Sequence, residues 1–448
     1  MLKNIGFLIK EVKKHLEEYL NEHGIDTSKR LFKCPNYKAH RHGDAKPSCN
    51  FYPNKTTFHC FACFIGDTLV YTSNGYKPIK YILPGERVLT HTGRFQPVTH
   101  IMRRPSPQAM YKIYTRTPEY MFVTPEHPFY IISREQVTHY FRDYTPSFVK
   151  ASELKPGDWV LIPIIHPKHR ISHIHLEPSF DLPLNRRVLL LLGLFIAEGY
   201  TNKYEVRFTI NKSETHLRYF IIKTLTKYFR VTPQWRTNSD NSCVIYFNLS
   251  EQPCLRNLFN SFYNEKKEKV IPPELFNNLS SKDAKYLIYG WLIGDGHITK
   301  HEGIVGCTTS QVLAHQIYYL AVRSYLLPIG HRRTNYHRLK GHKIRGKDAF
   351  YIRIRRVSKL KKVKKYTSSL EGRSITNTFY FKFQDIEYYA VPIYDIKKIK
   401  SPSKYVYNLE VSGDNSYTAV NVAVHNCSYK SGDIFDACLL YTSPSPRD

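Results

Sequence analysis

Between residues 64 and 164, short runs of alternating apolar and polar positions are separated by Gly, Pro and Asn residues. Runs such as DTLVYT, RVLTHTGRFQPVTHIM and DWVLIPII predict strands, because successive side chains of a strand point to opposite faces of a sheet. Runs of the same kind return near residue 390 and continue to Val424. We therefore expect all-β structure in both segments.

The chain between these two β segments has a helical period. Apolar positions recur at helical spacing over 185–230 and 280–328, with strand-like runs between and after them, which predicts α+β structure. The longest apolar run, Val188–Ala197, is much shorter than the ~20 residues of a membrane span, so it predicts a core helix and no membrane partner. Two predicted helices end alike, in LLGLFIAEGY (191–200) and IYGWLIGDGH (288–297).

The composition indicates the kind of partner and the cellular location that we expect. The chain has 66 Lys and Arg residues against 37 Asp and Glu residues, and its formal charge of +29 favours a polyanionic partner such as nucleic acid. A soluble basic protein without such a partner has the same charge. The N-terminal stretch MLKNIGFLIKEVKKHLEE is an amphipathic helix pattern that contains acids and lacks the apolar region of a signal peptide. We therefore expect a cytoplasmic location and reduced thiols.

Cysteines and histidines gather in the stretch CPNYKAHRHGDAKPSCNFYPNKTTFHCFAC. A C-x-x-C turn that faces a second pair of soft ligands is typical of a tetrahedral zinc site. Cys60-x-x-Cys63, with Cys34 and His42 upstream, therefore favours zinc. Buried structural cysteines are the alternative, and His40 is a rival ligand.

This stretch resembles the zinc ribbon that opens bacterial-type DNA primases, but it is cut in two. HGDAKPS matches the family's spacing from His to Pro-Ser, and HCFAC matches the end of the ribbon. The expected continuation, CSYKSGDIFDACLL, begins only at Cys427, and joining Ala62 to Cys427 restores the pattern. The resemblance implies α+β zinc-ribbon flanks at 1–62 and 427–448, with a DNA template as partner. The implied zinc ligands are Cys34, His42, Cys60 and Cys427.

These flanks lack the polymerase and helicase-binding parts of a primase, so we expect no primer synthesis from this chain. The tail at 441–448, YTSPSPRD, matches nothing in that family.

Residues 63–426, which interrupt the ribbon, resemble an intein. CFIGDTLVYT is similar to the opening motif and VTPEHPFYI to an internal Thr-x-x-His motif; VYNLEVSGDNSYTAVNVAVHN with the next cysteine is similar to the closing motif. Taken singly, a core Cys63, a turn-forming Thr124 and a surface His425-Asn426 are simpler interpretations. Three motifs in order, inside a split zinc motif, favour the resemblance.

The implied Hint splicing domain is all-β, is built from 63–175 and 391–426, acts as a monomer and needs no cofactor. In such a domain, a thiol attacks the carbonyl of its own preceding peptide bond and converts the amide to a thioester. A hydrogen-bond donor and a general acid assist this step. A second thiol then takes the acyl group, and an Asn side chain cyclises while a His polarises its carbonyl. The residues implied for these roles, in that order, are Cys63, Thr124, His127, Cys427, Asn426 and His425.

The closing motif departs from the family pattern at two positions. Many inteins have an Asp after V-Y and a His before the last conserved aromatic step, where this chain has Asn408 and Asn415. The departures remove an acid and a base without removing an atom that forms or breaks a bond. A Hint protein that only cleaves is therefore the alternative to splicing.

The two similar helix endings resemble the paired LAGLIDADG motifs of homing endonucleases. Each carries small residues at i and i+4 on one face, which allow two helices to approach closely, and each ends in an acid followed by glycine, a residue suited to a C-cap. A helix C-terminus disfavours an anion by ~0.3–1 kcal/mol, and two such acids repel each other, so we expect a divalent cation between them. The small residues are Gly193, Ala197, Gly290 and Gly294, and the acids are Glu198 and Asp295.

The resemblance implies an α+β endonuclease domain over 176–390 that cuts both strands of a double-stranded DNA homing site. Glu198 and Asp295 would hold Mg²⁺, and Lys269 would be a basic residue near the cut. The basic stretch 330–366 contains FYIRIRRV, which suits a strand that lays arginines along phosphates. The alternatives are a solvated helix end for each acid, an edge strand guarded by lysines, and a non-catalytic zinc-dependent DNA-binding protein.

Overall fold

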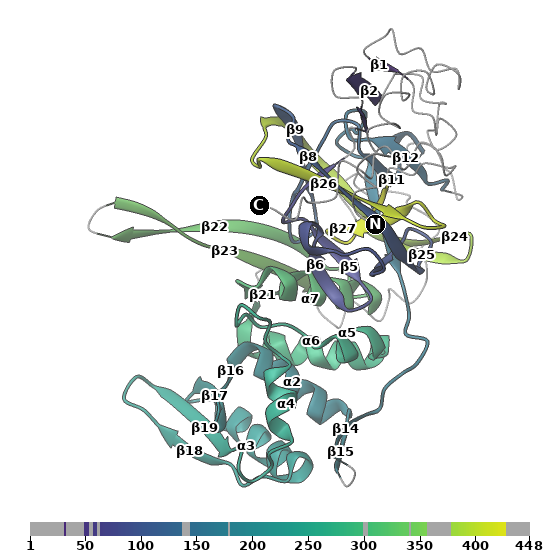
Figure 1. The fold of residues 1–448 in the computed structure, drawn as a ribbon. Helices are drawn as coiled ribbons and strands as arrows, with labels where there is room; N and C mark the ends of the chain where they lie inside the picture. Colours follow the sequence, from purple (N-terminus) through teal and green to yellow (C-terminus); the bar gives the residue numbers. More distant parts are fainter. Residues whose placement is uncertain are drawn as a thin grey trace, which may run out of the picture.

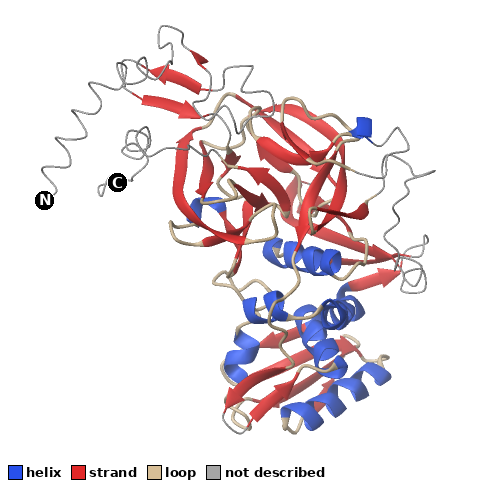
Figure 2. Ribbon diagram, turned by 90° about the vertical axis from the view of Figure 1, so that its right-hand side faces the viewer, coloured by secondary structure: helices blue, strands red, loops and turns tan. Residues whose placement is uncertain are grey.

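The computed structural model describes residues 63–136, 144–177, 180–298, 303–339, 342–355 and 378–426, together with short strands at 31–32, 49–52 and 57–60. Figure 1 shows an upper half made almost entirely of strands and a lower half that mixes helices with strands. Figure 2, turned by 90°, shows the same division, with most of the helices below the strands of the upper half. The predicted all-β and α+β segments are confirmed by these two halves.

The upper half is one 15-stranded antiparallel sheet that closes on itself. Its order is β12-β11-β13-β25-β9-β10-β4-β26-β8-β7-β5-β27-β28, with β24 beside β25 and β6 beside β5. A further pairing, Phe129 with Val424, joins β11 to β28 and closes the ring. The strands are β4 (Phe64–Ile65), β5 (Leu69–Thr72), β6 (Gly75–Pro78), β7 (Arg87–Leu89), β8 (Phe95–Pro105), β9 (Ala109–Thr115), β10 (Met121–Val123), β11 (Pro128–Ile132), β12 (Ser147–Lys150), β13 (Trp159–Ile164), β24 (Phe379–Phe383), β25 (Ile386–Lys400), β26 (Tyr405–Val411), β27 (Ser416–Ala419) and β28 (Val422–His425), with short helices η3 (Ile79–Tyr81) and η4 (Arg134–Gln136).

Strands from both ends of the described chain alternate in this sheet. β4 lies between β10 and β26, and β25 bridges β13 and β9. Residues 379–390 already pair within this sheet, so the boundary that we predicted after residue 390 falls inside β25. The strands that follow Cys63 and the strands that precede Asn426 therefore belong to one sheet.

The lower half repeats one arrangement twice. Each copy is a long helix, two strands, a second helix and two more strands, and the sheet orders β16-β17-β19-β18 and β20-β21-β23-β22 match position by position. The first copy is α2 (Arg186–Glu198), β16 (Gly199–Thr201), β17 (Glu205–Asn211), α3 (Thr215–Thr224), β18 (Gln234–Thr237) and β19 (Ser242–Asn248), with a π-helical turn at Leu225–Phe229. The second is α6 (Ser281–Asp295), β20 (Gly296–Ile298), β21 (Gly303–Thr308), α7 (Gln311–Arg323), β22 (Ile329–Leu339) and β23 (His342–Arg355). The copies are joined by α4 (Leu255–Asn260) and α5 (Pro273–Asn278), and the hairpin β14 (His173–Glu177) and β15 (Phe180–Pro183) precedes the first copy.

The helices α2 and α6 touch through their backbones. A Cβ placed on Gly193 would lie 2.1 Å from the Leu287 carbonyl oxygen, and one on Gly290 would lie 2.1 Å from the Leu190 carbonyl oxygen. No side chain fits in such a space, so only glycine permits this crossing. The close approach predicted from the small residues is confirmed, and it brings the C-terminal ends of the two helices together.

The two halves share one buried apolar core. Tyr71 of β5 packs against Phe276 of α5 and Tyr319 of α7, with ring centroids 5.3 and 5.1 Å apart. The Tyr319 hydroxyl donates to the Pro163 carbonyl at 3.0 Å. In the part of the chain that the structure describes, no helix combines the length and the apolar character that crossing a bilayer requires.

The short N-terminal strands form a separate three-stranded sheet. β1 (Leu31–Phe32) pairs with β2 (Cys49–Tyr52), and β2 pairs with β3 (Thr57–Cys60). The amphipathic helix predicted for the N-terminal stretch 1–18 lies outside the described residues.

Candidate functional site

The N-terminal end of the interrupting segment lies against the Thr-x-x-His motif. The Cys63 side chain is 3% exposed, and its backbone N–H donates to the Thr124 Oγ1 at 2.8 Å. The Thr124 N–H in turn donates to the Cys63 carbonyl at 3.0 Å. Thr124 therefore touches the nitrogen of the 62–63 peptide bond directly. We expected its hydroxyl to act as a donor, but here it accepts, because the Cys63 nitrogen still carries its proton.

His127 follows Thr124 in a tight turn and is fully buried. Its N–H donates to the Thr124 carbonyl at 3.2 Å, and its ring lies edge-on to Phe64 with centroids 4.3 Å apart. Phe129 and Tyr417 enclose the ring further. Three aromatic side chains therefore border the His127 ring and hold its position next to Thr124.

The C-terminal end lies on the next strands of the same sheet. Asn426 is 3% exposed, its N–H donates to the Asn415 carbonyl at 2.9 Å, and its Nδ2 donates to the Val411 carbonyl at 3.2 Å. The His425 Nδ1 contacts the Asn426 carbonyl oxygen. In the tautomer that carries a proton on Nδ1, this contact polarises that carbonyl.

One segment borders both ends. β10 pairs Val123 with Phe64, next to Cys63, and β11 pairs Phe129 with Val424, just before His425. The turn that holds Thr124 and His127 joins these two strands. A single continuous stretch of sheet therefore positions the two junctions relative to each other.

The two amides that replace the expected acid and base are both structural in this fold. Asn408 is fully buried on β26, and its Oδ1 accepts from the Tyr417 hydroxyl at 2.8 Å and from the Leu409 N–H at 2.9 Å. Asn415 has a φ of 50°, a left-handed conformation that Asn tolerates well, and its carbonyl anchors Asn426.

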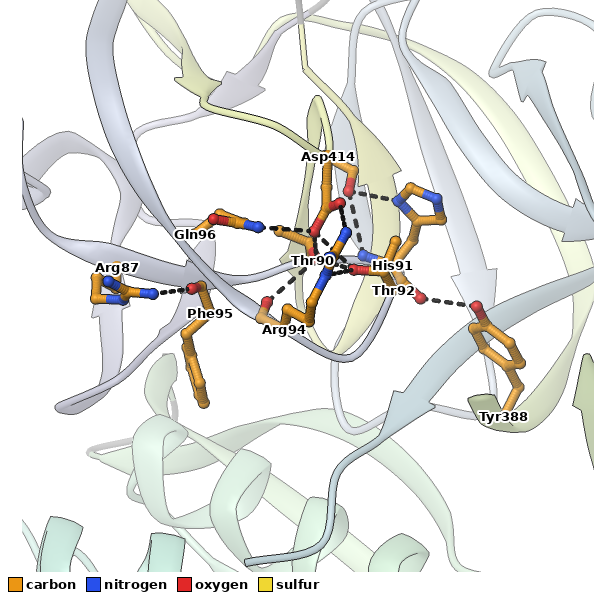
Figure 3. Close-up of polar contacts among 10 residues, drawn as sticks. Arg87, Thr90, His91, Thr92, Arg94, Phe95, Gln96, Tyr388 and Asp414 are labelled. Carbon is orange, nitrogen blue, oxygen red and sulfur yellow. Dashed lines mark hydrogen bonds and ion pairs between the residues drawn. The ribbon is translucent and has the colours of Figure 1, made fainter. Parts of the chain in front are cut away.

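The loop before β27 is held by an acid that the sequence analysis did not single out. Figure 3 shows the Asp414 carboxylate at the centre of contacts from Thr90, Thr92, Arg94 and Gln96. Burial by itself would raise the pKa of Asp414, but the hydrogen bonds from Thr92, Thr90 and Arg94 outweigh it and hold that pKa below its ordinary value.

His91 lies next to this cluster and ties β7 to β27. Its Nδ1 contacts the Ser416 Oγ at 2.6 Å, and the Tyr388 hydroxyl donates to its carbonyl at 2.7 Å. Burial lowers the pKa of His91 to about 4, although Asp414 acts in the opposite direction. No motif marks His91, Asp414 or Arg104, which contacts the Cys63 sulfur, because long-range strand pairing alone brings them to the junctions.

In the lower half, the predicted acids meet where α2 and α6 end. A Cβ on Gly294 would lie 2.8 Å from the Glu198 Cγ, which shows how closely the helix ends approach. Burial and the neighbouring Asp295 raise the pKa of Glu198. The pKa of Asp295 is also raised by burial, although its side chain reaches solvent, while the hydrogen bond from the Trp291 Nε1, at 3.0 Å, and Lys269 counteract that rise. The glycines after these acids, Gly199 and Gly296, have negative φ, so they are needed for space rather than for a left-handed cap.

Lys269 approaches the acids from the segment before α5. Its Nζ donates to the Phe195 carbonyl at 2.8 Å and lies 3.6 Å from the centre of the Phe195 ring. Burial lowers its pKa to about 7, while Asp295 acts to raise it. A lysine with a pKa near neutrality can exchange a proton during a reaction.

Burial raises the pKa of both carboxyl groups, and a divalent cation between them would favour their ionised forms. Mg²⁺ is commonly held by one or two protein carboxylates, and substrate phosphates complete its coordination. Among the described residues, no group of three or more His, Cys, Asp or Glu side chains is arranged to hold a metal by itself. The predicted zinc ligands lie outside the residues whose side chains the structure describes, so the zinc site stays a prediction; they are Cys34, His42, Cys60 and Cys427.

Known families match both halves. Residues 52–177 match the Hint module, and residues 189–283 match the LAGLIDADG DNA endonuclease family. The chain carries a Hint module and a LAGLIDADG endonuclease domain.

Three curated relatives cover most of this chain. It is 26% identical over 430 residues to the uncharacterized protein MJ0043 of Methanocaldococcus jannaschii, which covers 84% of this chain and 52% of the relative. It is 27% identical over 414 residues to the ATP-dependent DNA helicase Hel308 of Thermococcus kodakarensis (81% and 36%). It is 24% identical over 424 residues to the iron-sulfur cluster assembly SufBD family protein Mb1496 of Mycobacterium bovis (86% and 45%). The chain spans about half the length of these relatives or less.

Solved structures similar to parts of the chain include the gp41-1 intein, with 24% identity, 22% of this chain and 68% of that chain covered, and a TM-score of 0.18. Another is I-DmoI in complex with DNA and Ca, with 15% identity, 40% and 88% covered, and a TM-score of 0.26.

Proposed function

We propose that residues 63–426 excise themselves from the chain by protein splicing. The contact that carries this proposal is the hydrogen bond from the Cys63 N–H to Thr124, on the segment that also pairs with the strand ending at His425. A nucleophile is thereby held beside its own peptide bond, and the second junction is held in the same sheet. The Hint module match supports the same chemistry.

In the first step, the Cys63 sulfur attacks the carbonyl of residue 62 and the C–N bond breaks, while His127 protonates the leaving nitrogen. Cys427 then takes the acyl group by thioester exchange. Asn426 closes its side-chain amide nitrogen onto its own carbonyl, which His425 polarises, and the 426–427 bond breaks. An S-to-N shift then joins residue 62 to residue 427.

The Hint part is proposed to comprise 63–175 and 391–426, extended by the strands at 379–390 that pair with it. The endonuclease part lies between them, within the predicted 176–390. The relatives support an insertion, because two that align with over 80% of this chain are named for unrelated activities, a DNA helicase and iron-sulfur cluster assembly. We propose that the flanks 1–62 and 427–448 form a primase-like zinc module once joined.

The splicing proposal is tested by the intact mass of the expressed full-length chain. We expect a product of residues 63–426 and a second product that joins 1–62 to 427–448. Separate flanks without the joined product would show cleavage only. Cys63→Ala should abolish cleavage at the N-terminal junction, and Cys243→Ala, a buried cysteine of the other half, should leave splicing intact. N-terminal cleavage that persists in Cys63→Ala would sink the proposal.

We also propose that the lower half is a site-specific double-strand DNA endonuclease. Glu198 and Asp295 would hold Mg²⁺, which when bound neutralises the two carboxylates and the developing charge on the phosphate. Lys269 would accept or return a proton beside them. The raised pKa values of both acids and the lowered pKa of Lys269 support this assignment.

The substrate for the test is a DNA duplex that encodes residues 1–62 joined directly to 427–448, since an endonuclease that spreads its own gene must recognise the uninterrupted sequence. Wild-type protein should cut it in Mg²⁺. Asp295→Asn should lose at least ~10²-fold in cutting rate, whereas Glu265→Gln, an exposed acid of the same half, should not. Equal cutting by wild type and Asp295→Asn would refute the assignment.

Lys269 gives the nuclease a pH signature. If neutral Lys269 accepts the proton, the cutting rate should rise with pH through about 7, the pKa that burial gives it. Lys269→Met should cut DNA ~10²-fold more slowly at pH 8, and its cutting rate should not rise with pH through about 7. A wild-type rate that is flat between pH 6 and 8 would exclude this role.

A further inference from the structure

The Cys63 sulfur has a cationic neighbour that the splicing steps above do not use. Arg104, a half-buried residue of β8, directs its Nε at the Cys63 Sγ, and the two atoms are 3.4 Å apart. β8 reaches this position because it pairs with β26, where Arg104 lies opposite Val406, and Val406 packs on Cys63. The guanidinium is therefore positioned by the sheet.

The Cys63 side chain also contacts apolar side chains of neighbouring strands. Cys63 packs in a small cluster with Met110 of β9 and Val406 of β26, and Lys112 of β9 lies over the Tyr120 ring, 3.6 Å from its centre. Burial raises the pKa of Glu126, and Arg104 and Lys150 counteract that rise. The charged or titratable side chains near Arg104 include Glu126 and His127 of the turn after β10, and Lys150 of β12.

We propose that Arg104 is a catalytic residue of the first splicing step, which holds the Cys63 sulfur as a thiolate. This proposal rests on the splicing function proposed above. A thiol is a poor nucleophile, and an adjacent arginine favours the thiolate in a site that largely excludes water. Arg104 thereby supplies activation that the neutral Asn408 cannot supply.

The step is balanced without a further reactant. The sulfur loses its proton and forms the S–C bond to the carbonyl of residue 62, and the C–N bond to Cys63 breaks. The nitrogen gains one proton through His127, so the conversion is an isomerisation in which one proton moves from sulfur to nitrogen. Arg104 keeps its charge throughout, because a guanidinium does not lose its proton at these pH values.

The test follows thioester formation alone. In the full chain with Asn426→Ala and Cys427→Ala, the reaction stops after the first step, and hydroxylamine then cleaves at the 62–63 junction. The rate of this cleavage is measured from pH 6 to pH 9. In the parent protein this rate should rise with pH as the Cys63 thiol loses its proton, and we call this rise the limb of the pH profile. Arg104→Gln should move the limb up by ~1 pH unit and lower the rate at pH 7 about tenfold, since the loss of one neighbouring opposite charge shifts a pKa by about that much.

Three variants separate charge from architecture. Arg104→Lys keeps the charge and should retain most of the rate and the position of the limb. Glu126→Gln removes a nearby anion and should move the limb to lower pH. Arg103→Gln, the exposed neighbour on β8 whose guanidinium lies 3.8 Å from the Tyr405 ring centre, should leave the profile unchanged.

The outcomes also separate this proposal from splicing itself. If Arg104→Gln lowers the rate at every pH without moving the limb, or if Arg104→Lys is equally impaired, the residue acts only through structure and the proposal is wrong. If Cys63→Ala is cleaved by hydroxylamine as fast as its parent, splicing by Cys63 is wrong. Cleavage that requires Cys63 but keeps the same pH profile in Arg104→Gln would remove Arg104 and leave splicing standing.

Discussion

In the upper half, which we call the splicing region after its proposed function, the candidate residues come from distant parts of the described chain. They meet because β4, β10, β11 and β28 lie in one closed sheet. In the lower half, which we call the endonuclease region after its proposed function, the two acids come from equivalent ends of two similar helices. The surrounding sheets repeat the same strand order. The first site is buried, with Cys63 and Asn426 each 3% exposed. At the second, the Asp295 side chain reaches solvent.

The difference agrees with the two proposed functions. A splicing site reacts with its own chain, so it needs no opening for a substrate, and burial strengthens its hydrogen bonds and excludes water. An endonuclease must admit a DNA duplex and a cation, so its acids have to remain accessible. Repetition suits the second proposed task, because two equivalent acids would serve the two strands of a DNA duplex.

The largest expected effect comes from forcing the helix pair apart. Gly193→Val would place side-chain atoms on the Leu287 carbonyl, so we expect a loss of at least ~3 kcal/mol of stability in the lower half and no DNA cutting. Differential scanning calorimetry with a cutting assay measures both. Arg187→Val, at an exposed position of the same helix, controls for the β-branched residue. N-terminal cleavage should persist in Gly193→Val; its loss would show that the two regions fold as one unit.

An intermediate effect is expected where the regions are joined. Glu119, between β9 and β10, pairs with Arg332 of β22, accepts from the Gln311 Nε2 at 2.5 Å, and is 9% exposed. Glu119→Ala removes one partner from Arg332, a partly buried cation that still has Asp348, so we expect a loss of ~1–3 kcal/mol. Because Glu119 immediately precedes the strand that leads to Thr124, splicing should slow as well. Unchanged splicing in a destabilised Glu119→Ala protein would show that this ion pair serves only the interface.

The smallest effect is a pH dependence that His91 contributes in the upper half. His91 has a pKa of about 4 in the fold and 6.5 when unfolded, so the unfolded chain binds more protons between these values. The free energy of unfolding is therefore unaffected by His91 above pH 6.5 and decreases as the pH falls toward 4. The decrease is ~2 kcal/mol between pH 8 and pH 5. Burial also lowers the pKa of Lys269 to about 7, so Lys269 adds a loss of stability over the same range. In a Lys269→Met background, His91→Gln should therefore flatten urea-denaturation stability between pH 8 and pH 5. Asp414, whose pKa is lowered, contributes stability that is lost only as the pH falls below about 3.8, so it does not mask the effect. An equally steep loss in His91→Gln would assign the dependence to another group.

The local features of both regions were predictable from the sequence. Alternation predicted the strands on both sides of the middle segment, and the helix period with small residues at i and i+4 predicted the contact between α2 and α6. The predicted boundary at residue 390 was misplaced, because β24 and β25 have the same strand pattern whether they pair within the middle segment or with β13 and β9. Strand pairing over such distances leaves no mark on the local alternation.

By itself, the sequence determined which reactive groups the chain carries and in what order: a cysteine at residue 63, a Thr-x-x-His turn, a terminal His-Asn, and two acids at the ends of similar helices. Only the tertiary structure decided their surroundings. Arg104 beside the Cys63 sulfur, Lys269 beside Asp295, and Asn415 as the anchor of Asn426 all depend on contacts between distant segments. The physical reason is that side-chain identity and periodicity act over a few residues, whereas burial, charge and pKa are set by whatever the fold packs around a group.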